Sequence, residues 1–124
     1  ALPISTMSMT DQELLELAAK AAGHNVRHVL ANGGLDIGAD WEPWNPLADD
    51  GDALRLAVKL GIDVTHKAFG DDEVMTSASE DQFDGWFTEP YGADRLAATR
   101  RAIVRAAAEM VRNKTPNAKG NRPA

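Results

Sequence analysis

Apolar residues recur at the spacing of an amphipathic helix in three segments of the chain. The first segment begins at a capping box formed by Thr10 and Glu13. It ends at Gly23, because glycine readily adopts the positive φ that ends a helix. The second starts at the acidic residues 49–52, which suit the N-terminus of a helix, and ends at Gly61. The third spans residues 93–113 and is the longest. The pattern therefore predicts a helix near each end of the chain and one in the middle.

The same spacing assigns a buried side to each helix. For the first helix it consists of Leu14, Leu17, Ala18 and Ala21. For the middle helix it consists of Leu54, Ala57, Val58 and Leu60, and for the last helix of Leu96, Ile103, Ala107 and Met110. In the middle helix Arg55 and Lys59 then face water.

Alternating apolar and polar residues between the helices predict two β-hairpins. The first pairs residues 25–30 with 35–39 around an Asn-Gly turn, and the second pairs residues 62–69 with 73–78. The element order is then αββ-αββ-α. We expect an α+β fold in which an antiparallel sheet of three to four strands has its helices packed on one face.

The remaining segments are expected to be irregular. Two prolines in residues 40–47 argue for a loop, and residues 79–91 form an acidic connection that contains aromatic residues. We expect a flexible extension over residues 1–9 and a single domain over residues 10–114. Residues 115–124 read TPNAKGNRPA, which is typical of a disordered tail.

Composition narrows the class of protein. With 124 residues the chain has the length of one domain, and with no cysteine it has neither a disulfide nor a cysteine zinc site. No apolar run approaches the roughly 20 residues that span a bilayer, and no secretory signal is recognisable, so we expect the cytoplasm of a bacterial cell. The net charge of −6 is uneven: residues 95–124 hold eight Lys and Arg with one Glu, whereas residues 1–94 hold five with eighteen Asp and Glu.

No catalytic or metal-binding motif emerges from the spacing of reactive residues. The histidines are His24, His28 and His66, and none belongs to a recognisable ligand pattern. The acidic residues 49–52 lack the distant glutamate of a calcium loop, which favours helix capping. We therefore expect no metal site and no cofactor, and we favour a non-enzymatic protein while leaving the question of activity open.

Aromatic and acidic residues in the predicted loops favour a surface that binds a protein partner. The candidate residues are Trp41, Trp44, Asn45, Asp49, Asp50, Asp71, Asp72 and Trp86. The alternative is structural, because tryptophans that fold back on a sheet bury large apolar areas and acidic residues in turns are ordinarily solvated.

Two further alternatives stay open. Arg101, Arg105 and Arg112 on the last helix could contact nucleic acid, although the acidic remainder of the chain offers them internal partners. A small enzyme with a site near the tryptophan-rich loop is the other alternative, and a deep pocket with titratable groups near Trp44 or His66 would favour it.

Three strings together resemble a group of small phage and prophage proteins of unassigned function. They are DQELLELAAKAAG at residues 11–23, WNPLADDGDALRLAVKL at residues 44–60 and ATRRAIVRAAAE at residues 98–109. The resemblance covers about half of the folded residues and implies action inside an infected bacterium, but it implies no catalytic residue. The hypothesis that follows is a phage accessory protein, a monomer or small homo-oligomer, that binds or inhibits a host or defence protein.

Overall fold

The structure, a computed structural model, describes residues 9–38, 42–67, 71–80 and 83–112. The expectations for the flexible extension, apart from Met9, and for the C-terminal tail lie outside these ranges. So does Trp41.

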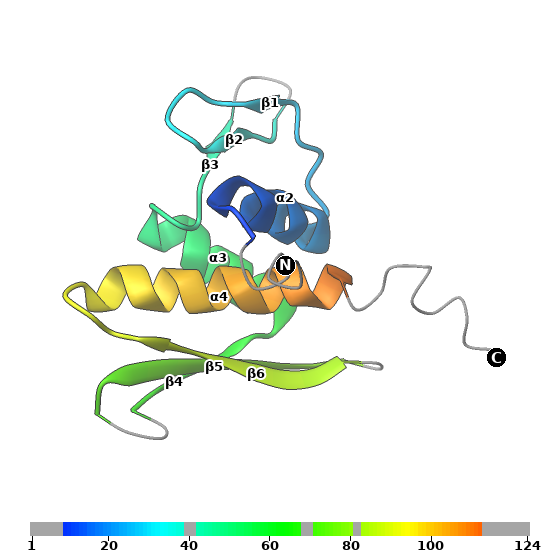
Figure 1. The fold of residues 1–124 in the computed structure, drawn as a ribbon. Helices are drawn as coiled ribbons and strands as arrows, with labels where there is room; N and C mark the ends of the chain where they lie inside the picture. The colour runs from blue at the N-terminus through cyan, green and yellow to red at the C-terminus, as the bar shows by residue number, and fades with distance from the viewer. Residues whose placement is uncertain (1–8, 39–41, 68–70, 81–82, 113–124) are drawn as a thin grey trace, which may run out of the picture.

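The longest helix, α4 (Arg95–Arg112), runs through the middle of the molecule (Figure 1). One side of it packs on a β-sheet, and the other side packs on α2 (Asp11–Ala22) and α3 (Asp50–Leu60). A second, smaller sheet lies beyond α2 (Figure 1). The last helix of the chain is therefore the element on which all the main layers meet.

Within the described ranges, six strands form two antiparallel sheets of three strands each. The small sheet consists of β1 (His28–Val29), β2 (Leu35–Asp36) and β3 (Pro43–Trp44). The large sheet consists of β4 (Asp63–His66), β5 (Glu73–Glu80) and β6 (Phe83–Pro90). The α+β class and the antiparallel pairing are confirmed, with α4 covering one face of the large sheet.

The element order is αβββ-αβββ-α, because two strands fall in segments that were expected to be irregular. Pro43 lies in the edge strand β3, where a missing N–H is tolerated. The β6 sequence, FDGWFTEP, has no clear alternation, and its pairing with all eight residues of β5 makes it a strand. These long-range contacts are absent from any local pattern.

The predicted helix ends are confirmed. The Thr10 hydroxyl accepts the Glu13 backbone N–H at 3.1 Å, and the Glu13 carboxylate accepts the Thr10 N–H at 2.9 Å. Gly23 and Gly61 end α2 and α3 with φ of 84° and 71°. Local capping chemistry therefore sets the limits of these two helices.

The buried side of α3 was predicted correctly for Ala57 and, in part, for the half-buried Leu60, but wrongly for Leu54 and Val58. Leu54 and Val58 are 64% and 72% exposed, whereas Ala53, Leu56 and Ala57 are buried. Since α3 packs chiefly on α4, only a narrow stripe of its surface is covered. Leu96, at the start of α4, is likewise 60% exposed, while Ile103, Ala107 and Met110 are buried as predicted.

Candidate functional site

The structure divides the predicted partner-binding residues into two groups. Trp44 is 6% exposed, and its ring meets the edge of the His24 ring at a centroid distance of 5.2 Å. It belongs to the main hydrophobic core, together with Leu35 of the neighbouring strand. Trp44 is therefore not an exposed anchor, because β3 pairs with β2 in a register that places its ring in the core.

The polar residues that follow Trp44 stabilise the entry to α3. The Asn45 side chain accepts the Leu47 N–H at 3.1 Å. Asp49 is the N-cap of α3, and its carboxylate accepts the Asp52 N–H at 2.8 Å. The exposed Asp50 carboxylate forms an ion pair with Arg100 at 2.6 Å. The structure thus gives Asn45, Asp49 and Asp50 intramolecular contacts, as the helix-capping alternative requires.

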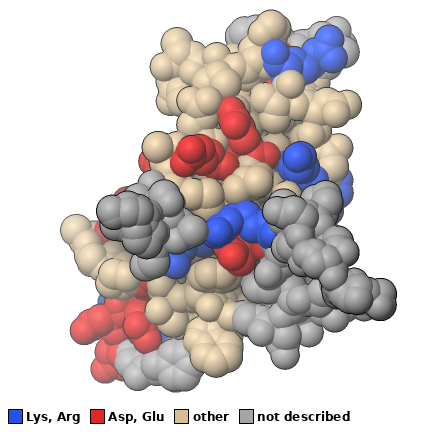
Figure 2. All heavy atoms as spheres, turned by 45° about the vertical axis from the view of Figure 1, so that its right-hand side comes forward, with Lys and Arg blue, Asp and Glu red and all other residues tan. Residues whose placement is uncertain are grey.

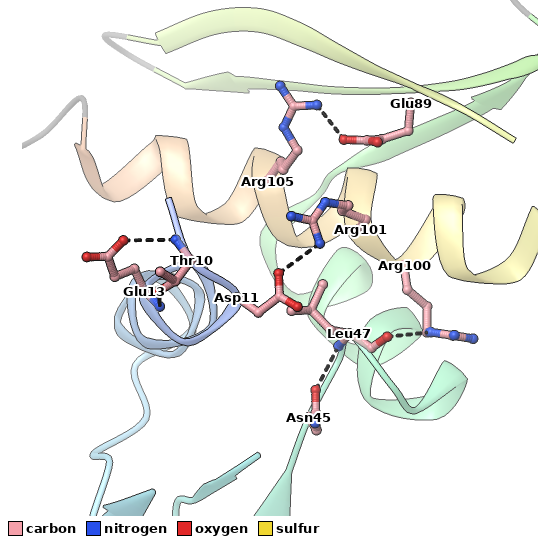
Figure 3. Close-up of polar contacts among 9 residues, drawn as sticks. All are labelled: Thr10, Asp11, Glu13, Asn45, Leu47, Glu89, Arg100, Arg101 and Arg105. Atoms are coloured by element: carbon pink, nitrogen blue, oxygen red, sulfur yellow. Dashed lines mark hydrogen bonds and ion pairs between the residues drawn. The ribbon is translucent and has the colours of Figure 1, made fainter. Parts of the chain in front are cut away.

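The arginines of α4 hold three other elements against it (Figure 3). Arg100 donates from Nε to the Leu47 carbonyl at 2.8 Å, at the entry to α3. Arg101 pairs with Asp11 of α2 at 3.0 Å. Arg105 pairs with Glu89 of β6 and lies over the Phe87 ring.

The positive charges that suggested nucleic-acid binding are paired with carboxylates of the same chain. Figure 2 shows Lys and Arg atoms lying directly against Asp and Glu atoms in the middle of this face. Arg101, Arg105 and Arg112 line one cavity of about 470 Å³, but each pairs with a carboxylate, Arg112 with Glu109 at 2.9 Å. A phosphate backbone would have to displace these partners. The contacts fit the alternative of an internally ion-paired helix.

The three histidines lie in different surroundings. Among the residues that the structure describes, no group of three His, Cys, Asp or Glu side chains could hold a metal ion. His66 on β4 hydrogen-bonds through Nδ1 with the Tyr91 hydroxyl, and its ring stacks on that of Tyr91. His28 lies on the exposed strand β1.

The second group of candidates lies at the large sheet. Thr76 on β5 is buried and donates to the Ala102 carbonyl of α4 at 2.8 Å, so this position faces the helix. Phe87 pairs opposite Thr76 and shares its face. Because successive side chains alternate, Trp86 points to the opposite face, where it is 61% exposed.

That opposite face carries no described helix or strand (Figure 1). By register, the described side chains on it are those of Asp63, Thr65, Glu73, Met75, Ser77, Trp86, Thr88 and Pro90. We call this set the open face. Trp86 lies opposite Ser77 and diagonal to Met75, which is within reach of an indole ring. Asp71 and Asp72 are exposed in the turn that leads into β5.

The outer edge of β6 is less accessible than the open face. The Tyr91 N–H donates to the Asp72 carbonyl, so the odd-numbered residues of β6 are those hydrogen-bonded to β5. The N–H and C=O of Thr88 therefore point away from β5, toward the outer edge. Arg105 donates to the Thr88 carbonyl at 3.3 Å, and Pro90 has no N–H to offer. A partner strand therefore finds this edge partly blocked.

Sequence reasoning named Trp86 as a candidate and missed the other residues of the open face. Asp71 and Asp72, which it also named, lie in the adjacent turn. Met75, Thr65 and Thr88 join the face only through the register of three strands, one of which was not predicted. The two-residue spacing of Trp86 and Thr88 would place Thr88 on the same face of a strand as Trp86, but it carries no information on Met75 or Thr65.

No family model, no curated protein and no solved structure matches this chain. Within the described ranges, the helices are too short or too polar for one of them to cross a membrane.

Proposed function

We propose that this chain is a non-enzymatic protein-binding module, of phage origin, that binds a host or defence protein in the bacterial cytoplasm through the open face. The observation that carries the proposal is Trp86, a large aromatic residue that is 61% exposed on a sheet face with no covering element among the described residues. The resemblance of the chain to small phage proteins supports a role inside an infected bacterium, and the exposed indole of Trp86 supports binding to another protein.

An exposed tryptophan on a flat strand surface suits the role of an anchor. The ring loses little conformational freedom on binding, and its burial removes a large apolar area from water. Met75 beside it is half-buried and adds a polarisable apolar contact. Threonine and serine side chains around the two residues supply a polar rim.

The charge of the open face favours a basic partner. Its described ionisable strand residues are Asp63 and Glu73, and the exposed Asp71 and Asp72 extend the negative charge at one end. The exposed Lys67, whose backbone N–H donates to the Glu73 carbonyl, offsets one of these four negative charges. Complementary charges around an apolar anchor speed association and fix orientation. We therefore expect a partner with an apolar socket surrounded by Lys and Arg.

Quantitative affinity capture from bacterial lysate tests the proposal. Trp86→Ala should reduce the amount of captured partner at least about tenfold, since an anchor residue contributes about 2 kcal/mol or more to the binding free energy. The matched control is Leu96→Ala, because Leu96 is 60% exposed, nearly as much as Trp86, but lies on α4. This control should capture as much partner as the unmodified protein.

A second pair of variants tests the charge argument. The double variant Asp63→Lys, Glu73→Lys should reduce capture of the same partner, and raising the salt concentration should weaken capture by the unmodified protein.

A folding control accompanies Trp86→Ala. Its free energy of unfolding, measured in urea, should stay within about 0.5 kcal/mol of that of the original chain, as for other surface changes. Equal capture by Trp86→Ala, by Leu96→Ala and by the original chain would overturn the proposal.

A further inference from the structure

A cavity of about 380 Å³ lies between the end of α2, the small sheet and α3, on the other side of α4 from the open face. Its apolar surface comes from Ala22, Ile37, Pro43, Trp44 and Leu56. This volume is in the range of sites for small molecules, which are typically apolar with a few convergent polar groups. The cavity therefore has the size and the partly apolar lining of a ligand site.

Opposite charges reach the cavity from different walls. Arg55 and Lys59 are four residues apart on α3 and share one face of the helix. Glu42 comes from the connection between β2 and β3, where its backbone N–H donates to the buried Asp36 carboxylate at 2.8 Å. Arg55 is ion-paired with Asp52 of the same helix at 2.8 Å, so the opposite charges that remain for a ligand are Lys59 of α3 and Glu42 of the β2–β3 connection.

The other lining carboxylate is occupied. Asp52 accepts the Asn45 N–H at 2.9 Å through Oδ2 and the Arg55 guanidinium at 2.8 Å through Oδ1. Those two contacts fix both oxygens inside the structure and orient Arg55. Glu42 is therefore the carboxylate better placed to receive a cationic group.

His24 completes the lining. It meets Trp44 edge to face, and Lys59, Glu42 and Asp52 all act on its charge. Burial, followed by the nearby Lys59 ammonium, lowers the pKa of His24, so its ring is uncharged near neutral pH. A neutral imidazole offers one donor and one acceptor without adding a charge to the cavity.

We propose that this cavity binds a small zwitterion of the α-amino-acid type with an apolar side chain. Lys59 binds its carboxylate, Glu42 binds its ammonium group, and its side chain packs on Ile37, Trp44 and Leu56. This binding activity is separate from the proposed protein-binding function, because it uses no residue of the open face.

Isothermal titration calorimetry with free leucine and free phenylalanine tests the proposal on the whole chain. Binding of at least one of them is expected, and its N-acetyl and amide derivatives should each bind at least about tenfold more weakly, because each lacks one charge. Lys59→Ala and Glu42→Gln should weaken binding of the free amino acid to a similar extent. The matched controls Lys20→Ala and Glu16→Gln change exposed residues of α2 outside the cavity and should bind normally.

The proposal is overturned if neither free amino acid binds. It is also overturned if the N-acetyl derivative binds as well as the free amino acid, since the cavity then recognises only an anion. Unchanged affinity in both Lys59→Ala and Glu42→Gln would place the binding elsewhere. If either variant fails to fold, the comparison of free and blocked amino acids on the original chain decides.

Discussion

The ring of His24 shows how one side chain can couple the structure to pH. Burial is the main reason that its pKa lies below the usual 6.5, and the positive charge of Lys59 adds to the effect. The unfolded chain therefore binds a proton on His24 at a higher pH than the folded chain does. Between these two pKa values the unfolded state gains protonation that the folded state lacks, and acidification favours unfolding.

We expect the free energy of unfolding to fall as the pH drops below about 6.5, and this contribution to level off once His24 is protonated in the folded state. His24→Gln should remove that part of the pH dependence. Urea unfolding at a series of pH values measures it, with His28→Gln on the exposed strand β1 as the control. A slope that His24→Gln leaves unchanged would contradict this account.

Trp44 and Trp86 show how far single residues of the site could be predicted. Both lie in segments without clear periodicity, so the sequence marks them as large aromatics but does not distinguish the core from the surface. The register of β3 buries Trp44, and the register of β6 exposes Trp86. Asp49 was predictable as a helix cap because capping depends on neighbours within a few residues.

Among the elements, α2 and α4 pack against each other, and both helices bury small side chains. Ala18 and Ala19 of α2 and Ala106, Ala107 and Ala108 of α4 are all fully buried. Alanine at these positions allows two helices to approach closely, and it leaves no room for a larger side chain.

Ala107→Leu should therefore destabilise the protein by about 1–3 kcal/mol, the usual cost of overpacking a filled core. Ala48→Leu places the same group at an exposed position before α3 and should have little effect. Urea midpoints at constant m-value compare the two variants. Equal stability of Ala107→Leu and the original chain would show that the helices can separate without cost.

Helices were easier to predict than strands in this chain for a physical reason. Caps and periodicity act within a few residues, and they defined the ends of α2 and α3 closely. The strand β6 and the buried side of α3 depend on contacts with distant elements. Leu54 and Val58 fit a helical stripe, yet only packing against α4 decides which stripe is covered.

At the scale of the whole molecule, the basic α4 is enclosed by an acidic body, and its ion pairs differ in environment. Arg101 meets an Asp11 side chain that is 67% exposed, so solvent screens the pair. Arg105 meets a Glu89 side chain that is 15% exposed, and it also contacts the Thr88 carbonyl and the Phe87 ring. The two pairs should therefore contribute unequally to stability.

Arg101→Met should cost less than about 1 kcal/mol, as expected for an exposed pair. Arg105→Met should cost about 1–3 kcal/mol, because it leaves a largely buried carboxylate without its partner. Chemical denaturation at low and high salt measures both, and only the Arg101 pair should weaken strongly with salt. The reverse order of the two costs would contradict the assigned environments.

The central position of α4 also has a consequence for biosynthesis. Among the described elements, α2 and α3 contact each other little, and the large sheet contacts α4 much more than it contacts either of them. At about 5–20 residues per second, the roughly 90 residues between the ends of α2 and α4 take about 5–20 s to translate. During that interval the apolar side of α2 lacks its main partner helix, α4. We therefore expect the apolar side of α2 to stay largely exposed in the nascent chain until α4 emerges from the ribosome.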